Sequence, residues 1–240
     1  MNKQLFLLHF AGGNKYSYNF LQKTITSDIE FIPIELPGRG ERFRESLITG
    51  KKEAIDDLFL QIKKKRNGSP FIVLGHSMGA LLGLFVTRML EEHHDFPEFL
   101  MVLGNPGPLK NHKIPTRYNL DDDTFKKRIS EMGGIPIEIL ENQDAFSFFA
   151  KIMRADFECI EKEQGFENDV VIKTPIYAMM GSEESLNTKI ENWRGFTESQ
   201  FHHSILPGNH FFIHDNGPEI GKLINHCFKL KESNYVKNKI

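Results

Sequence analysis

The sequence predicts an α/β fold in which a mostly parallel sheet is covered by helices on both faces. Short apolar segments alternate with segments of helical periodicity along most of the chain. The apolar segments are nearly continuous, which is typical of parallel strands buried on both faces. The chain has 240 residues, of which 40% are hydrophobic and 26% charged, so one domain with a sizeable core is expected.

The apolar runs and the periodic segments locate the expected elements. The runs that predict strands are 4–10, 31–36, 71–75, 99–104, 174–180 and 202–207. Apolar residues three or four positions apart predict helices over 15–26, 52–65, 78–92 and about 217–230.

The region 108–170 interrupts this alternation, because it contains polar segments of helical periodicity and no convincing strand. We expect residues 1–230 to form a single domain with an insertion at about 108–170, followed by a polar tail over 231–240. Apolar residues in 122–163 either roof an apolar chamber as a movable lid or pack the insertion on the sheet. These residues are Phe125, Ile129, Phe146, Phe148, Phe149, Ile152 and Phe157.

Charge and cysteine content exclude several classes of protein. The net charge of −2, with both signs interspersed, does not favour nucleic-acid binding. Two cysteines, Cys159 and Cys227, without C-x-x-C spacing indicate reduced thiols and no metal site. No apolar run approaches the roughly 20 residues of a membrane span, and the run 5–8 is shorter than the roughly 7–15 residues of a signal peptide. We expect a cytoplasmic monomer with no membrane partner.

The segment GHSMG at 75–79 carries the most chemical information. It fits G-x-S-x-G, and it joins the apolar run 71–75 to the helix 78–92. A sharp turn there strains the serine backbone and projects its hydroxyl above the sheet, and Gly75 and Gly79 leave room for neighbouring backbone. The pattern predicts Ser77 as a nucleophile and the Met78 N–H as an oxyanion donor; the alternative is a chance match.

A catalytic serine needs a base, and the base needs an acid to orient it. In α/β-hydrolases the acid follows the serine and the histidine comes last. The histidines near the C-terminus are His202, His203, His210, His214 and His226. We choose His210, because LPGNHFFI places it on a loop between the last strand and the last helix. Glu183 and Glu184 follow the strand 174–180, and of the two we prefer Glu184.

A second oxyanion donor is expected in HFAGG (9–13), directly after the first strand. Its glycines leave the backbone open, so the N–H of Phe10 or Ala11 completes an oxyanion hole with Met78. We prefer Ala11. The alternative is that Gly12 and Gly13 only form a turn.

Together these motifs resemble the type II thioesterases of the α/β-hydrolase superfamily, which accompany nonribosomal peptide and polyketide synthases. The resemblance spans about residues 4–230. The matching segments are HFAGG, LPGRGERF (36–43), GHSMGA, MGGIPIEIL (132–140), MRADFECIE (153–161) and GNHFFI. There are two departures. Glu184 stands where the family usually has the aspartate of G-x-x-D, and GNPGP (104–108) replaces a Ser-Gly-x-x-Ala-Pro stretch near the active-site mouth.

The resemblance implies a serine thioesterase with Ser77 as nucleophile, His210 as base and Glu184 as acid, and with no metal or organic cofactor. Its substrates would be acyl thioesters on the phosphopantetheine arm of carrier proteins, from which it would remove misprimed or stalled acyl groups. One alternative is a medium-chain acyl-carrier or acyl-CoA thioesterase, or a general esterase. Another is a catalytically impaired scaffold that binds carrier proteins.

Four charged residues of the matching segments have predicted roles outside the chemistry. Arg39 and Arg42 either bind a phosphopantetheine phosphate or an acidic carrier surface, or brace loops through backbone hydrogen bonds, which we favour. Arg154 and Asp156 are expected to fix the insertion to the body of the domain.

Overall fold

A central parallel sheet organises the protein. The computed structural model describes residues 1–108, 116–162 and 170–237. The six strands lie in the order β2-β1-β3-β4-β5-β6, and all neighbours are parallel. They are β1 (Lys3–Leu8), β2 (Ile29–Ile34), β3 (Phe71–His76), β4 (Phe99–Leu103), β5 (Ile176–Gly181) and β6 (Phe201–Leu206). Each lies close to its predicted run, which confirms the predicted fold class.

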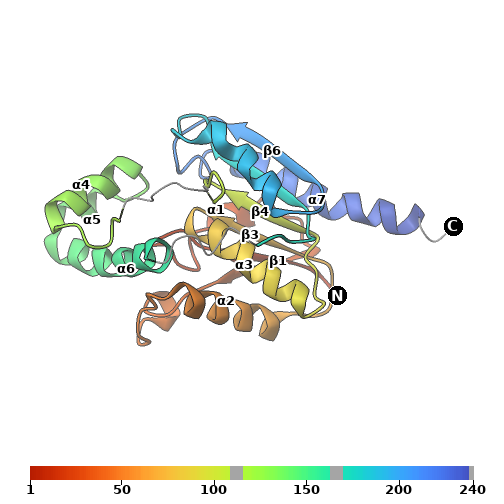
Figure 1. Ribbon diagram of the computed structural model, residues 1–240, viewed down its shortest axis with the longest axis horizontal. Helices are drawn as coiled ribbons and strands as arrows, with labels where there is room; N and C mark the ends of the chain where they lie inside the picture. Colours follow the sequence, from red (N-terminus) through yellow and green to blue (C-terminus); the bar gives the residue numbers. More distant parts are fainter. Residues whose placement is uncertain (109–115, 163–169, 238–240) are drawn as a thin grey trace.

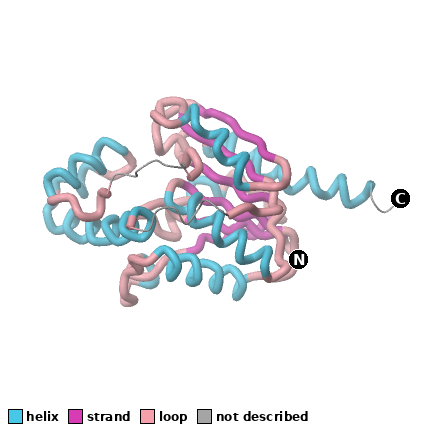
Figure 2. Tube along the Cα trace, viewed as in Figure 1, coloured by secondary structure: helices cyan, strands magenta, loops and turns pink. Residues whose placement is uncertain are grey.

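Helices cover both faces of the sheet (Figures 1 and 2). Alternate residues of β1 face opposite sides, so Phe6 and Leu8 pack in one core while Leu5 and Leu7 pack in the other. The first core is covered by α2 (Lys51–Lys65), α3 (Met78–Glu92) and the 3-10 segment η2 (Asn187–Phe196). The second is covered by α1 (Asn19–Gln22) and α7 (Gly217–Lys237).

Two predicted elements were wrong in extent. Only Asn19–Gln22 of the predicted helix 15–26 is helical. The preceding residues form turns in which Asn14 accepts a hydrogen bond from the Tyr16 N–H and Ser17 accepts one from the Asn14 N–H. Such local side-chain bonds compete with helix formation. At the other end, α7 continues through 231–237, where a polar tail was expected.

The insertion forms a helical group with its own small core. It contains α4 (Asp122–Met132), α5 (Ile137–Glu141) and α6 (Gln143–Glu161). Figure 1 shows these helices beyond the sheet, on the side opposite the end of α7. Phe125, Ile129, Phe146 and Phe157 form the centre of this core, whereas Phe148 is exposed. The described part of 108–170 is therefore helical, as expected.

The parallel arrangement brings the ends of the strands to one edge. The register sets Leu8 beside Gly75 and His76 beside Leu103, so the loops after β1, β3 and β4 are neighbours. Loops at the carboxyl edge of such a sheet are the usual place for a site. In the described ranges of the chain, no helix has both the length and the apolarity to cross a membrane.

Candidate active site

The turn between β3 and α3 has the geometry that the GHSMG motif predicts. Ser77 has φ 55° and ψ −110°, and only His94 shares a positive φ among the non-glycine residues that the structure describes. A Cβ on Gly75 would overlap the Gly79 carbonyl, and a Cβ on Gly79 would overlap the Leu8 carbonyl. Both positions are therefore restricted to glycine, and the Ser77 backbone is strained.

The start of α3 leaves backbone donors next to Ser77. The Ser77 carbonyl accepts hydrogen bonds from the N–H groups of Ala80 and Leu81. Within the described residues nothing accepts from the Met78 N–H. This unpaired group lies at the positive end of the helix and is suited to binding an anion.

His210 lies on the loop after β6 and is paired with a carboxylate from the loop after β5. Its Nδ1 is 2.7 Å from Glu184 Oε2, and the side chains are 19% and 10% exposed. The other carboxylate oxygen, Oε1, accepts a hydrogen bond from the Gly181 N–H at 2.8 Å. Because the carboxylate accepts, Nδ1 carries the proton and Nε2 is left as the basic nitrogen. Glu183, the other candidate, is exposed.

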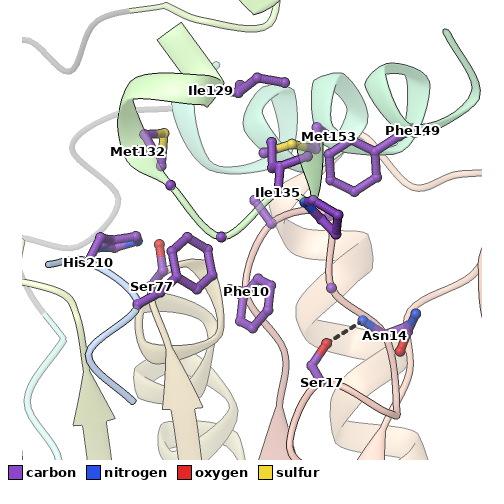
Figure 3. A pocket seen from close by; sticks show the side chains of 17 residues that line it. Phe10, Asn14, Ser17, Ser77, Ile129, Met132, Ile135, Phe149, Met153 and His210 are labelled. Atoms are coloured by element: carbon purple, nitrogen blue, oxygen red, sulfur yellow. Dashed lines mark hydrogen bonds between the residues drawn. The ribbon is translucent and has the colours of Figure 1, made fainter. Parts of the chain in front are cut away.

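Ser77 and His210 line the same pocket, and Figure 3 shows their side chains next to each other. Phe10 and Ala11 line it from the loop after β1. The insertion closes it from above with Ile129, Met132, Ile135, Phe149 and Met153. Some apolar residues of the insertion therefore roof the pocket, whereas Phe125, Phe146 and Phe157 pack within the insertion and not on the sheet. In the described chain, His202, His203, His214 and His226 do not line this pocket.

Two lid segments approach the strand loops closely. A Cβ on Gly12 would lie 2.8 Å from Met153 Cγ and 2.9 Å from Phe149 Cζ, so α6 packs directly on the loop after β1. A Cβ on Gly134, between α4 and α5, would overlap the ring of Phe211, which follows His210. The insertion thus contacts both loops that flank Ser77.

The charged residues mostly brace loops. Arg39 donates to the Gly13 carbonyl and to both oxygens of Asp156, and Arg42 donates to the Glu35 carbonyl at 2.9 Å and pairs with Asp57 and Glu45. These bonds support the preferred interpretation over phosphate binding.

Asp156 fixes the insertion to the body, as predicted, because it pairs with Arg39 and accepts from the Gly12 N–H. The prediction for Arg154 was wrong. Its guanidinium bonds the carbonyls of Tyr118 and Leu120 and the carboxylate of Asp122, all within the insertion. Residues two apart on a helix point to different sides, so the two charges have different neighbours.

The loop after β4 supports the serine turn from a third direction. Asn105 donates from Nδ2 to the Ser77 carbonyl at 3.1 Å and accepts from the Gly107 N–H. A Cβ on Gly104 would lie 3.4 Å from His210 Cε1. The segment GNPGP therefore lies beside the site, as expected, and it holds the turn in place.

Sequence reasoning missed two buried histidines beside the site. His76 precedes Ser77, and its Nε2 donates to the His210 carbonyl at 2.9 Å. Burial lowers the pKa of His76 well below its usual value, and the nearby His210 lowers it further. His9 follows β1, and its ring contacts the backbone of Phe10 and Leu36. The signal in the sequence was a polar residue directly next to a buried apolar run.

The serine turn after one parallel strand and the paired histidine on the loop after the last are the arrangement of an α/β-hydrolase. Within that class the chain belongs to the thioesterase family, since the family described as "Thioesterase domain" matches residues 3–229.

Several similar proteins are named for gramicidin or NRPS/PKS pathways, and others are named as medium-chain S-acyl fatty acid synthase thioesterases. The linear gramicidin dehydrogenase LgrE of Brevibacillus parabrevis is 29% identical over 92% of this chain and 85% of its own length. The gramicidin S biosynthesis protein GrsT of Aneurinibacillus migulanus is 29% identical over 90% and 85%. The crystal structure of ClbQ from the colibactin NRPS/PKS pathway has a TM-score of 0.88 at 25% identity, covering 97% of this chain and 99% of that one.

Proposed function

We propose that this protein hydrolyses acyl thioesters on the phosphopantetheine arm of carrier proteins and so removes misprimed or stalled acyl groups during nonribosomal peptide or polyketide synthesis. The observation that carries the chemistry is the 2.7 Å contact between His210 Nδ1 and Glu184 Oε2, in a pocket that His210 shares with Ser77. Membership of the thioesterase family and the names of similar proteins support this choice of substrate.

The first half of the reaction acylates Ser77. Its Oγ attacks the thioester carbonyl while His210 Nε2 takes the proton. The oxyanion accepts hydrogen bonds from the N–H groups of Met78 and Ala11. When the C–S bond breaks, the thiolate takes the proton from His210 and leaves as the carrier-bound thiol.

The second half releases the acid. Water enters where the thiol left, and His210 Nε2 removes its proton as it attacks the acyl-serine carbonyl. The same N–H groups hold the second oxyanion, and His210 returns the proton to Ser77 Oγ. Glu184 stabilises the imidazolium in both halves and keeps Nδ1 protonated. The cycle needs no metal or organic cofactor.

The cell compartment and assembly state belong to the same proposal. Cys159 and Cys227 are buried thiols, which favours a reducing compartment such as the cytoplasm, where carrier proteins also work. We propose that the enzyme acts as a monomer, which size-exclusion chromatography with light scattering would check.

The decisive experiment compares two thioesters of the same acyl group. Acetyl-loaded peptidyl carrier protein and acetyl-coenzyme A are incubated at equal concentration with the enzyme and with Ser77→Ala, and the loss of acetyl is followed by mass spectrometry. We expect faster loss from the carrier, and none above background with Ser77→Ala. Equal or faster hydrolysis of the coenzyme A thioester would indicate a small-molecule thioesterase. Carrier binding without turnover would indicate a scaffold.

A further inference from the structure

His9 is a buried histidine whose two ring nitrogens both contact backbone. The residue is 3% exposed. Its Nδ1 lies 2.9 Å from the Phe10 carbonyl oxygen, and its Nε2 lies 3.3 Å from the Leu36 nitrogen. A carbonyl accepts and an amide donates, so the ring must be neutral with its proton on Nδ1.

The surroundings keep the ring neutral. Burial and the charge of Arg39 lower the pKa of His9 to about 4, although the Asp156 charge and the Phe10 carbonyl oppose the shift. At neutral pH the ring therefore serves as donor to one loop and acceptor from another, without a net charge of its own.

The contact to Phe10 sets the direction of the next N–H group. In a planar trans peptide, the C=O of one residue and the N–H of the following residue point in opposite directions. The Phe10 carbonyl accepts from His9 Nδ1 and from the Gly13 N–H at 2.9 Å. The Ala11 N–H consequently points away from the interior of this turn, and in the described chain it has no acceptor. Ala11 lines the pocket that contains Ser77.

The neighbouring N–H groups are less suitable donors. The His9 carbonyl faces the start of α3, since a Cβ on Gly79 would lie 2.7 Å from it, so the Phe10 N–H points away from that helix. The Gly12 N–H already donates to Asp156 at 2.7 Å. Ala11 is thus the donor of this loop that remains free to bind an oxyanion.

We propose that His9 is a positioning residue for the oxyanion hole: the hydrogen bond from its Nδ1 to the Phe10 carbonyl holds the Phe10–Ala11 peptide with the Ala11 N–H directed into the Ser77 pocket, and the Leu36 N–H keeps the ring in the tautomer that donates this bond. The inference rests on the proposed serine-hydrolase chemistry. Losing one oxyanion donor costs on the order of 100- to 1,000-fold in kcat. An N–H donor that is present but points in the wrong direction should lower kcat by less, about 10- to 100-fold.

The test uses substitutions that keep one ring contact at a time. His9→Asn places an amide N–H where Nδ1 was, so it retains the bond to Phe10. His9→Gln places its amide where Nε2 was, so it retains the bond to Leu36 and loses the one to Phe10. Gln4→Leu is the control. Gln4 is fully buried in β1, the strand that precedes His9, at the far end from the site, where it bonds Glu30 and Arg66.

The readouts are the rate of Ser77 labelling by a fluorophosphonate, and kcat and KM for an acyl thioester. The fluorophosphonate develops negative charge on its phosphoryl oxygen during attack, so it reports on the oxyanion hole without depending on the natural substrate. His9→Gln should lower the labelling rate and kcat by about 10- to 100-fold with little change in KM. His9→Asn should stay within about threefold of wild type. Gln4→Leu should lower the melting temperature and leave both rates unchanged.

The outcomes separate this inference from the proposed function. Equal rates for His9→Asn and His9→Gln, or losses that follow melting temperature in all three variants, would overturn the role of His9. If the fluorophosphonate labels Ser77 of the wild-type enzyme but the enzyme leaves carrier thioesters intact, the proposed substrate is wrong. The labelling rates of the His9 variants can still be compared in that case. A wild-type enzyme whose Ser77 is not labelled would overturn both.

Discussion

The guanidinium of Arg39 and the carboxylate of Asp156 form a two-pronged ion pair at 2.6 and 2.7 Å, with side chains 3% and 1% exposed. Asp156 lies on α6 of the lid, and Arg39 follows β2. The same carboxylate accepts from the Gly12 N–H, so one residue joins the lid to the loop that carries the proposed oxyanion donor. This ion pair therefore holds α6 of the insertion against the body of the domain.

Asp156→Asn should destabilise the protein strongly, because it leaves the buried Arg39 charge without an opposite charge beside it. We expect a loss of about 3–5 kcal/mol in the free energy of unfolding. Replacing both partners, in Arg39→Met with Asp156→Leu, should cost less than the single substitution. Urea unfolding measures all three. Asp122→Asn is the control, since its pair with Arg154 is exposed on the Asp122 side and contributes at most about 1 kcal/mol. Equal costs for both single variants would contradict this assignment.

Glu184→Gln should lower kcat on a carrier thioester by about 1,000- to 10,000-fold. The amide cannot stabilise the imidazolium, and it favours the wrong tautomer of His210. Glu184→Asp should retain intermediate activity, because its shorter side chain reaches the 2.7 Å contact only if the loop moves. The matched control is Glu183→Gln, an exposed neighbour in the same loop, which should leave kcat unchanged. If Glu184→Gln hydrolysed the thioester at the wild-type rate, Glu184 would not be the acid that orients and stabilises His210.

Acid should destabilise the protein through its buried histidines. The pKa of His9 is lowered to about 4, whereas histidine in an unfolded chain titrates near 6.5. Between these values the unfolded chain binds more protons, so the free energy of unfolding falls as the pH falls. The loss for His9 reaches about 3 kcal/mol at pH 4.

Urea unfolding of wild type and His9→Asn from pH 7 to pH 4 isolates the contribution of His9 to the pH dependence of stability, since asparagine does not titrate. The difference in unfolding free energy between the two proteins should change by about 3 kcal/mol over the range. His202→Asn, which replaces an exposed histidine, is the control and should follow wild type. Parallel curves for wild type and His9→Asn would show that His9 is free to charge in the folded state.

Phe149→Ala should extend the acyl chamber. The Phe149 ring lines the pocket and packs where a Cβ on Gly12 would lie 2.9 Å from it. Removing the ring opens space beyond the reacting carbonyl, so kcat/KM for a hexanoyl thioester relative to acetyl should rise by about tenfold or more. Phe148→Ala, a truncation of the exposed neighbour on the same helix, should leave the ratio unchanged. An unchanged ratio in both variants would mean that the acyl group of the substrate does not bind beside Phe149.

The strands and the serine turn were predictable because their causes are local. Uninterrupted apolar runs have few alternatives to a strand buried on both faces, and the steric demands on Gly75 and Gly79 follow from the turn itself. The prediction of a helix over 15–26 was wrong for an equally local reason. The side chains of Asn14 and Ser17 form hydrogen bonds with nearby backbone, and the spacing of apolar residues gives no sign of these bonds.

The sheet, the helical insertion, the turn at Ser77 and the loop that carries His210 could all be predicted from local patterns in the chain. The pairing of Glu184 rather than Glu183 with His210, the ion pair of Asp156 with Arg39 and the backbone contacts of both His9 nitrogens emerged only in the folded protein. The physical reason is separation along the chain. Apart from the contact between His9 and Phe10, these contacts join residues on different elements, and which side chain reaches a partner depends on how the parallel strands bring those elements to one edge of the sheet.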